Sequence, residues 1–435
     1  MASVKMTVFA LVDANNFYAS CEKLFEPRLA GKPVVVLSNN DGCVVARSAE
    51  AKALGVPMGA PWHQLRDLAR REGITACSSN YALYADMSNR VVEVLGQFCP
   101  RLEVYSIDES FLDLTGFSYQ DAEGLTGYGR QIRRRIRDWL GLHVCVGIGP
   151  TKTLAKLANH CAKKGVAGAD GVCDFSATDE RELSTLFHRI AVGEVWGVGR
   201  KIAGRLEDMG IKTVRELREA DADTIRARFS VVLERTVHEL RGVSCLTLEE
   251  MALAKQQIMS SRSFGQYVYE LAELREAVAS YMGKAAGKLR AQDSVAGAVQ
   301  VHIRTNPFKH KEPQYQRTVT VPLPRPTSDT RELTGWALRL LEDMYRPGFA
   351  YQKAGVMLCE LQPKGVVQGS LFSGPAVAEQ SDALMRTLDA INAKWGRGTL
   401  RSSAEGGAKV WQMRRGNLSP AYTTSWEEVP RVLAK

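Results

Sequence analysis

The sequence predicts an α/β (α+β) protein built from several domains. Its 435 residues exceed what one hydrophobic core usually organises. The first ~165 residues alternate apolar runs with helical patterns in the order β-α-β-β-α-β, with one insertion. Residues 245–360 repeat a strand–helix–strand–strand–helix–strand order after a helical stretch at about 180–242. We therefore expect a ferredoxin-like sheet first, a helical domain next and a second mixed domain after it.

Each element of the first part follows from its apolar spacing and its breakers. Asn15 is a plausible N-cap for the first helix, and Gly31-Lys32-Pro33 breaks the chain after it. The expected strands are 8–12, 34–37, the hairpin 102–114 and 143–148; the expected helices are about 16–29, 49–54, 81–95, 125–140 and 151–164.

The rest of the chain is less uniform. Residues 166–178 are rich in Gly, Ala and Asp and predict a linker. The second mixed domain is expected to contain strands at 257–262, 296–304, 316–321 and 354–359, and helices at 271–290 and 329–345. Beyond Pro363 the chain is richer in Gly and Ser, so we expect a tail ordered partly on partners.

Composition limits the function classes. Hydrophobic residues make up 45% and charged residues 24%, as in ordinary soluble proteins, and the net charge of +9 favours a polyanionic partner such as nucleic acid. The nine cysteines include no Cys-x-x-Cys pair, which argues against a disulfide framework and a zinc site. No apolar run approaches ~18 residues and no signal-peptide pattern is present. We expect a cytoplasmic protein with no membrane partner.

Three acids next to apolar strands are the candidate catalytic residues. Asp13 ends the run 7–12, and Asp108 and Glu109 lie between the runs 102–105 and 111–114. Such acids repel one another, and two divalent ions about 3.5–4 Å apart would relieve this and stabilise the attacking and leaving oxygens of phosphoryl transfer. The alternative for each acid is a helix cap or a solvated turn.

The residues after Asp13 suit a triphosphate. If metal ions lie there, the Ala14 carbonyl is a further ligand, and the amides that open the next helix, including those of Asn16 and Phe17, point at the phosphates. Tyr18 would then pack under the sugar and exclude a 2′-hydroxyl. Core-facing aromatic rings at Phe17 and Tyr18 are the alternative.

Two lysines on predicted helices are candidate phosphate contacts. Lys52 and Lys156 each offer a point charge to a nucleotide, and a solvated helix face is the alternative for both. Thr151, after Gly149-Pro150, is a candidate helix cap.

Several segments are candidate contacts for DNA or for a partner. Gly197-Val198-Gly199 between short helices resembles a helix-hairpin-helix, whose amides, with Arg200 and Lys201, would grip a DNA phosphate; a glycine-rich turn is the alternative. Arg304 belongs to a basic set that flanks two late strands and would follow a duplex backbone, together with Lys309, Lys311 and Arg317. The arginine-rich helix at 125–140 is interpreted as a solvated face.

A short peptide in the tail has the pattern Gln-x-x-Leu-Phe. Gln368, Leu371 and Phe372 form it, and an apolar pair in a flexible segment is costly unless it docks into a pocket. Peptides of this kind bind sliding clamps, so these residues are the candidate clamp-binding motif.

The combined motifs resemble those of the UmuC type of Y-family translesion DNA polymerases. The two catalytic motifs are similar at Asp13–Glu22 and at Tyr105–Phe111. Further segments agree almost from end to end: 38–44, 78–81, 84–88, 196–199, 233–237, 261–265, 351–357, 392–400 and 418–424.

This resemblance implies a domain plan. Palm residues would be 1–37 and 81–168, with a small fingers insertion at 38–80, a thumb containing the helix-hairpin-helix at 178–242, a little finger at 245–360 and a UmuC-type C-terminal region at 361–435.

The resemblance also implies site roles and partners. Asp13, Asp108 and Glu109 would be the carboxylates that bind two Mg²⁺ ions, Tyr18 the steric gate, and Lys52 and Lys156 the contacts to the triphosphate of a deoxynucleotide. Ala49 stands where many members have a phosphate-binding tyrosine. Implied partners are primer-template DNA, a UmuD-type accessory dimer, RecA and the sliding clamp.

We therefore predict an error-prone, DNA-directed DNA polymerase for translesion synthesis in the bacterial SOS response, without proofreading. A nucleotide cyclase shares the palm skeleton but would not need the basic downstream domains. A regulatory DNA-binding subunit without catalysis is the other alternative, against which the complete acid set argues.

Overall fold

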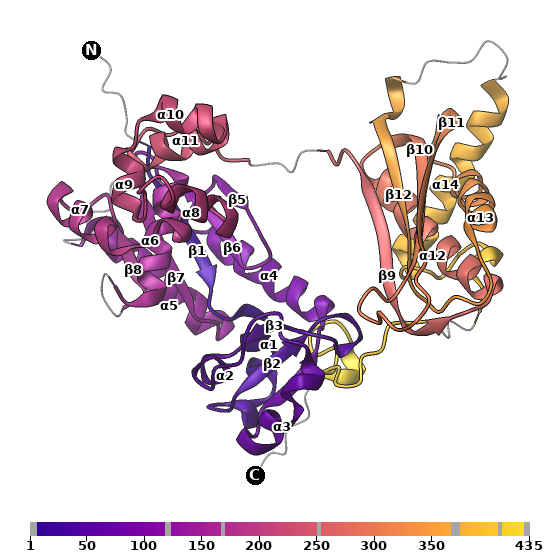
Figure 1. Cartoon of the computed structure of the whole chain (residues 1–435), viewed down its shortest axis with the longest axis horizontal. Coiled ribbons are helices and arrows are strands. Elements are labelled where there is room, and N and C mark those ends of the chain that lie inside the picture. The colour runs from indigo at the N-terminus through magenta and orange to yellow at the C-terminus, as the bar shows by residue number, and fades with distance from the viewer. Residues whose placement is uncertain are drawn as a thin grey trace. The chain divides into compact units, whose positions relative to one another are not determined.

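The computed structural model describes residues 7–117, 123–166, 170–249, 254–366, 375–407 and 411–429. Within these ranges the chain forms two compact units, drawn in Figure 1. Unit 1 comprises Met1–Leu37, Cys43–Ala252 and Asn417–Lys435, and unit 2 comprises Ser38–Gly42 and Leu253–Gly416. The predicted domain boundaries are finer than this division and stay predictions.

The central sheet of unit 1 has the predicted ferredoxin-like topology. Its strands pair in the order β5-β6-β1-β7-β8, and all pairs among β5, β6, β1 and β7 are antiparallel. The strands are β1 (Phe9–Ala14), β5 (Leu102–Val104), β6 (Glu109–Asp113), β7 (Val144–Gly149) and β8 (Val172–Asp174). Every residue of β1 and β7 is buried, as expected for central strands packed on both faces.

Helices α1, α4, α5 and α6 flank this sheet. Their bounds are Phe17–Phe25, Tyr81–Gly96, Gly124–Leu140 and Lys152–Lys164. Thr151 caps α6 by accepting a hydrogen bond from the Leu154 amide at 3.1 Å, as its position after Gly149-Pro150 predicts. Apolar residues of α1, α4 and α5 join one core with β1 and β7.

Three expectations for unit 1 were wrong. The first helix begins at Phe17, and its N-cap is Asn16, at φ 52°, a left-handed conformation that asparagine tolerates. That helix ends at Phe25, because Pro27 starts a separate 3₁₀ turn, η1 (Pro27–Leu29). The segment predicted as a linker contains β8, which pairs in parallel with β7 and extends the sheet.

The insertion after β2 (Val34–Leu37) is more ordered than the sequence patterns suggest. Strands β3 (Val44–Arg47) and β4 (Thr75–Ser78) flank β2, and helices α2 (Ala49–Ala53) and α3 (Trp62–Glu72) pack on them. Strands β3 and β4 were not predicted, because a strand of four residues carries little periodicity, and helix α3 was not predicted either.

The helical stretch forms its own core within unit 1. It contains α7 (Glu180–Arg189), η3 (Val192–Glu194), α8 (Arg200–Glu207), α9 (Val214–Glu219), α10 (Ala222–Arg228) and α11 (Val231–Leu240). Their apolar faces meet one side of α6 and β8 in a single cluster.

Unit 2 has the predicted strand–helix–strand–strand–helix–strand order. Its strands pair as β11-β10-β12-β9, and α12 and α13 pack against the sheet in one apolar cluster (Figure 1). The bounds are β9 (Ile258–Val268), α12 (Leu271–Ala291), β10 (Ser294–Thr305), β11 (Gln316–Thr327), α13 (Thr330–Met344) and β12 (Tyr351–Pro363).

The expectation of a non-periodic tail was wrong for one segment. Helix α14 (Pro375–Trp395) follows the short η4 (Lys364–Val366). Arg290 makes two hydrogen bonds to Asp389 at 2.6 and 2.7 Å, and Met385 is buried. The bidentate pair of Arg290 with Asp389 and the buried side chain of Met385 hold α14 against the rest of unit 2.

Gly147 on β7 allows α6 to lie directly on the sheet. A Cβ atom built at Gly147 would stand 2.0 Å from the Asn159 amide nitrogen and 2.3 Å from the Ala155 carbonyl oxygen. Both are backbone atoms of α6, so the helix would have to move. Asn159 reinforces the contact by donating to the carbonyls of Leu11 and Cys145.

We predict that Gly147→Ala lowers the free energy of unfolding by about 3 kcal/mol or more, because overpacking displaces α6. Urea unfolding of the full chain measures this. Gly204→Ala on α8 is the matched control, since a Cβ there meets nothing within 4 Å; it should be neutral or slightly stabilising. Equal stability of both variants would contradict the close approach.

Candidate active site

Antiparallel pairing of β1 and β6 places Asp13 opposite Glu109. Residues paired in this way have side chains on the same face of the sheet. Asp13 is only 5% exposed, and its carboxyl is hydrogen-bonded to that of Glu109. The Ala14 amide donates to the Asp108 carbonyl at 2.9 Å, so the β5–β6 turn is attached to the end of β1. Residues separated by almost 100 positions in the sequence therefore meet where strands β1 and β6 pair, at the last residues of β1 and the first residue of β6.

The turn that carries Asp108 is organised by Ser106. The Ser106 hydroxyl donates to the Asp108 carboxylate at 2.6 Å and accepts from the Glu109 amide at 3.1 Å. The carboxylate of Asp108 is thus held within its own turn. In the described part of the chain, no three His, Cys, Asp or Glu side chains are arranged to hold a metal ion. The structure brings Asp13 and Glu109 together and leaves the Asp108 side chain outside that pair.

Two lysines of α6 neutralise the paired acids. Lys156 donates to both oxygens of Glu109 at 2.7 and 2.8 Å, and its ammonium lies 4.6 Å from the centre of the Tyr105 ring. Lys163, two turns further along the helix, forms an ion pair with Asp13. Lys163 was not predicted as a site residue. Its spacing of seven residues from Lys156, which puts both lysines on one face of α6, is the sequence signal that could have identified it.

Burial controls the charge of Asp13. It raises the pKa of Asp13 from 3.8 to about 7, against the opposing attraction of Lys163. The paired carboxylates of Asp13 and Glu109, with Asp108 in the adjacent turn and the Ala14 carbonyl at the end of β1, are a set of hard oxygen donors. The chemistry of such a set fits a divalent cation.

A group of cations lies around Lys52, which is itself within electrostatic range of Asp13. Burial lowers the pKa of Lys52, and the neighbouring charges of Arg47, Lys163 and Lys164 lower it further, while Asp13 opposes them. The Lys52 ammonium donates to the Asn16 side chain at the start of α1. The Nε of Arg47 is buried and has no hydrogen-bond partner among the described residues. Mutually repelling cations with an unsatisfied donor fit a polyanionic ligand.

The aromatic pair after Asn16 has two different orientations. Phe17 is 3% exposed and belongs to the core. This agrees with the alternative interpretation of Phe17 as a core-facing aromatic ring. Tyr18 is partly buried, and its ring stacks on Tyr84 with 4.2 Å between centroids and 14° between planes. Burial raises the pKa of Tyr18, and the charge of Asp108 contributes, so Tyr18 lies within electrostatic range of the acid site.

The predicted helix-hairpin-helix has the expected local geometry. Gly197 has φ 85°, and Gly199 is the N-cap of α8. Val198 between them is buried, whereas Arg200 and Lys201 are exposed. The exposed side of this turn therefore combines two exposed cations with glycine backbone.

Arg304 lies on a basic face of unit 2. It is opposite Lys353 in the β10–β12 register, and burial together with Arg304 and Arg262 lowers the pKa of Lys353. The residues of the predicted clamp motif, Gln368, Leu371 and Phe372, lie outside the described residues.

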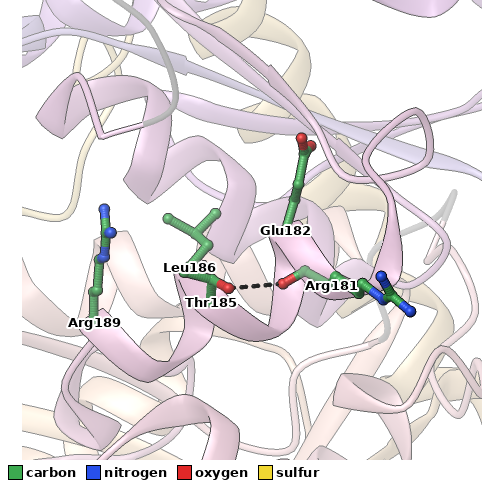
Figure 2. A pocket seen from close by; sticks show the side chains of 5 residues that line it. All are labelled: Arg181, Glu182, Thr185, Leu186 and Arg189. Carbon is green, nitrogen blue, oxygen red and sulfur yellow. Dashed lines mark hydrogen bonds between the residues drawn. The ribbon is translucent and has the colours of Figure 1, made fainter.

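A shallow hollow of about 310 Å³ lies on one face of α7. Figure 2 shows Arg181, Glu182, Thr185, Leu186 and Arg189 around it, and the Thr185 hydroxyl donates to the Arg181 carbonyl at 2.9 Å. None of the acids or lysines of the candidate site lines this hollow.

Comparisons with protein families match most of the chain. Residues 12–160 match the impB/mucB/samB family, residues 255–371 match the C-terminal domain of the same family, and residues 382–432 match a domain of unknown function, DUF4113. No helix in the described residues is long and apolar enough to cross a bilayer.

Solved structures show the same architecture. A Y-family DNA polymerase chimera of Dbh and Dpo4 aligns with a TM-score of 0.63 and 20% identity, covering 82% of this chain and 99% of that one. An insertion ternary complex of Dbh DNA polymerase aligns with a TM-score of 0.53 and 19% identity over 82% and 99%. The fold is that of the Y-family DNA polymerases.

Comparison of sequences finds relatives with higher sequence identity than these solved structures have. UmuC of Salmonella typhimurium is 50% identical over 98% of this chain and 100% of its own length. DNA polymerase IV of Desulfatibacillum aliphaticivorans is 30% identical over 90% of this chain and 95% of its own. The chain belongs to the impB/mucB/samB family, together with UmuC. The predicted translesion DNA polymerase is confirmed, and the regulatory alternative is not supported; DNA, deoxynucleotides and a divalent metal follow from this membership.

We predict that Asp13→Asn stabilises the metal-free protein at pH 8 by on the order of 2–4 kcal/mol. A pKa raised on folding, here to about 7, favours folding below the unfolded value of 3.8 and loses that contribution as the pH rises through 7. The advantage of the variant should therefore vanish near pH 4. Urea unfolding with a chelator at pH 4, 6 and 8 measures it; a difference independent of pH would contradict the raised pKa.

Proposed function

We propose that Asp13, Asp108, Glu109 and the carbonyl of Ala14 bind two Mg²⁺ ions and carry nucleotidyl transfer from a deoxynucleotide to a primer end. The register pair of Asp13 and Glu109, each neutralised by a lysine of α6, carries this proposal. When bound, the ions would supply charge neutralisation for the attacking and leaving oxygens.

The chain's own residues then prepare and position the reactants. Lys156 and Lys163 neutralise Glu109 and Asp13 through ion pairs, and with metal ions bound to the acids their ammonium groups would be available to the phosphates of the substrate. Lys52 and Lys163 lie near Asp13, Arg47 lies near Lys52, and together they would bind the triphosphate, with the unsatisfied Arg47 Nε as one donor. The amides at the start of α1, including those of Asn16 and Phe17, add partial positive charge. Because Ala49 offers no hydroxyl, the grip depends on these cations.

Tyr18 is proposed as the steric gate. Its ring lies one turn into α1 from the acid strand and is held by the stack on Tyr84. A ring fixed at this place leaves no room under the sugar for a 2′-hydroxyl.

DNA binding is proposed for two separate surfaces. In unit 1, the amides after Gly197 and Gly199, with Arg200 and Lys201, bind a backbone phosphate without reading bases. In unit 2, Arg304 shares a sheet face with Lys353, and the mutual repulsion of these cations is relieved by a phosphate backbone.

Further partners are proposed from the family alone. They are a UmuD-type accessory dimer, RecA and a sliding clamp bound by Gln368, Leu371 and Phe372. A cytoplasmic, nucleoid-associated location agrees with these partners.

We predict that Asp108→Asn lowers primer extension with Mg²⁺ by about 10³-fold, since losing one metal-binding carboxylate removes several kcal/mol of transition-state stabilisation. Single-nucleotide incorporation on a primed template measures the rate. Asp67→Asn on α3 is the control, because that acid is 90% exposed and lies on a surface helix. Unchanged extension by Asp108→Asn would refute the site.

We predict that Tyr18→Ala admits ribonucleotides, raising their incorporation relative to deoxynucleotides by about 100-fold, since a clash with one hydroxyl is worth a few kcal/mol. Tyr18→Phe is the matched control, because it keeps the ring and should keep the selectivity. The ratio of kcat/KM values for the two sugars is the measurement. A selectivity that Tyr18→Ala leaves intact would remove Tyr18 as the gate.

A further inference from the structure

A buried carboxylate lies behind the candidate steric gate. Tyr84 on α4 is fully buried beneath the Tyr18 ring, and its hydroxyl donates to Glu22 at 2.5 Å. Glu22 lies on α1, one turn after Tyr18, and is only 2% exposed. No step of the proposed reaction uses Glu22, so its burial needs a different explanation.

The second polar neighbour of Glu22 comes from near the C-terminus. The side chain of Ser419 lies beside the Glu22 carboxylate. Burial raises the pKa of Glu22, and the interactions with Tyr84 and Ser419 both oppose that rise. Burial disfavours the ionised form of a carboxylate, so these two interactions stabilise the charge that Glu22 carries when it is ionised.

The segment 417–422 is held firmly on unit 1. Asn80, the N-cap of α4, uses its side-chain amide to donate to the Ser419 carbonyl and hydroxyl and to the Pro420 carbonyl, at 3.0–3.3 Å. The Ser78 amide donates to the Asn417 carbonyl at 2.8 Å, and the Asn417 amide donates to the Ser78 hydroxyl at 3.0 Å. These bonds form a short two-way connection beyond the end of β4.

An aromatic stack fixes the same segment to α1. Tyr422 stacks on Phe25, with 5.0 Å between centroids and 11° between planes. Tyr18, Glu22 and Phe25 follow one another at spacings of four and three on α1, which puts them on one helix face. Segment 417–422 therefore contacts the helix face whose first member is the candidate gate.

We propose that segment 417–422 positions the steric gate through Ser419, Glu22 and Tyr84, and so contributes to sugar selectivity. This rests on the proposed role of Tyr18. The physical step is simple: the Ser419 hydroxyl holds Glu22, Glu22 holds the Tyr84 hydroxyl, and the Tyr84 ring supports the Tyr18 ring. Segment 417–422 belongs to the region that matches a domain of unknown function. The proposal assigns a positioning role to this part of that domain.

Ser419→Ala and Tyr84→Phe in the full-length chain test the connection, because each removes one hydroxyl and keeps the surrounding bulk. We expect the ribonucleotide-to-deoxynucleotide ratio of kcat/KM to rise about 3- to 10-fold in each, the effect of one hydrogen bond. The change should appear in the KM for the ribonucleotide, with kcat for the deoxynucleotide within about twofold. Ser419→Thr, which restores the hydroxyl, should restore selectivity, and Ser425→Ala, a serine of the same region, should leave it unchanged.

The outcomes separate this proposal from the steric-gate assignment. If Tyr18→Ala raises the ratio while Ser419→Ala and Tyr84→Phe leave it unaltered, the positioning role is wrong and the gate stands. If Tyr18→Ala also has no effect, the gate itself is wrong. An equal loss of activity with both sugars would show a purely structural role and overturn the proposal; should Ser419→Ala fail to fold, Tyr84→Phe decides.

Discussion

The pairing of Asp13 with Glu109 across the centre of a buried sheet is the constraint on which the rest of unit 1 depends. Two carboxylates on one face of adjacent strands repel each other, and burial makes the ionised form of Asp13 still less favourable. A fold that retains them has to supply positive charge nearby. Lys156 and Lys163 supply it from a single helix.

The position of α6 is accordingly tied down at several points. Gly147 lets the helix backbone contact β7 directly. At the other end, Glu239, which is fully buried, accepts from the Thr153, Cys245 and Leu246 amides. Lys152 forms a buried ion pair with Glu103 at 2.6 Å. A buried pair gives little net stability, yet breaking it leaves an uncompensated charge, so these contacts specify where the helix begins.

The acid site and the C-terminal segment share helix α1. Its first residues follow directly from the acid strand, and its later residues, Glu22 and Phe25, meet Ser419 and Tyr422. A helix of nine residues has little stability of its own and takes its position from what packs on it. The orientation of Tyr18 therefore depends on the sheet at one end of α1 and on a distant part of the chain at the other.

Local sequence was sufficient to predict the β-α-β-β-α-β skeleton of the first mixed domain and the order of strands and helices in the second. An apolar run that ends at Asp13 indicates β1, and apolar runs near glycine or proline indicate β7 and β10. The same reasoning failed for β8, β3 and β4, because a strand of three or four residues is defined by its partner strand. It failed for α14 because this helix is held by contacts such as the hydrogen bond from Arg290 to Asp389. The two residues are far apart in the sequence, so no local pattern indicates the contact.

What the sequence alone determined is which side chains lie at strand ends and helix starts, since periodicity and capping are local properties. Only the tertiary structure decided which lysine meets which acid: Lys156 contacts Glu109, and Lys163, which no local pattern singled out, contacts Asp13. It also decided that Glu22 is buried against Ser419, almost 400 residues away. These pairings follow from the register of β1 with β6 and from the close packing of α6 on β7. Neither the register nor this packing can be read from a short stretch of the chain.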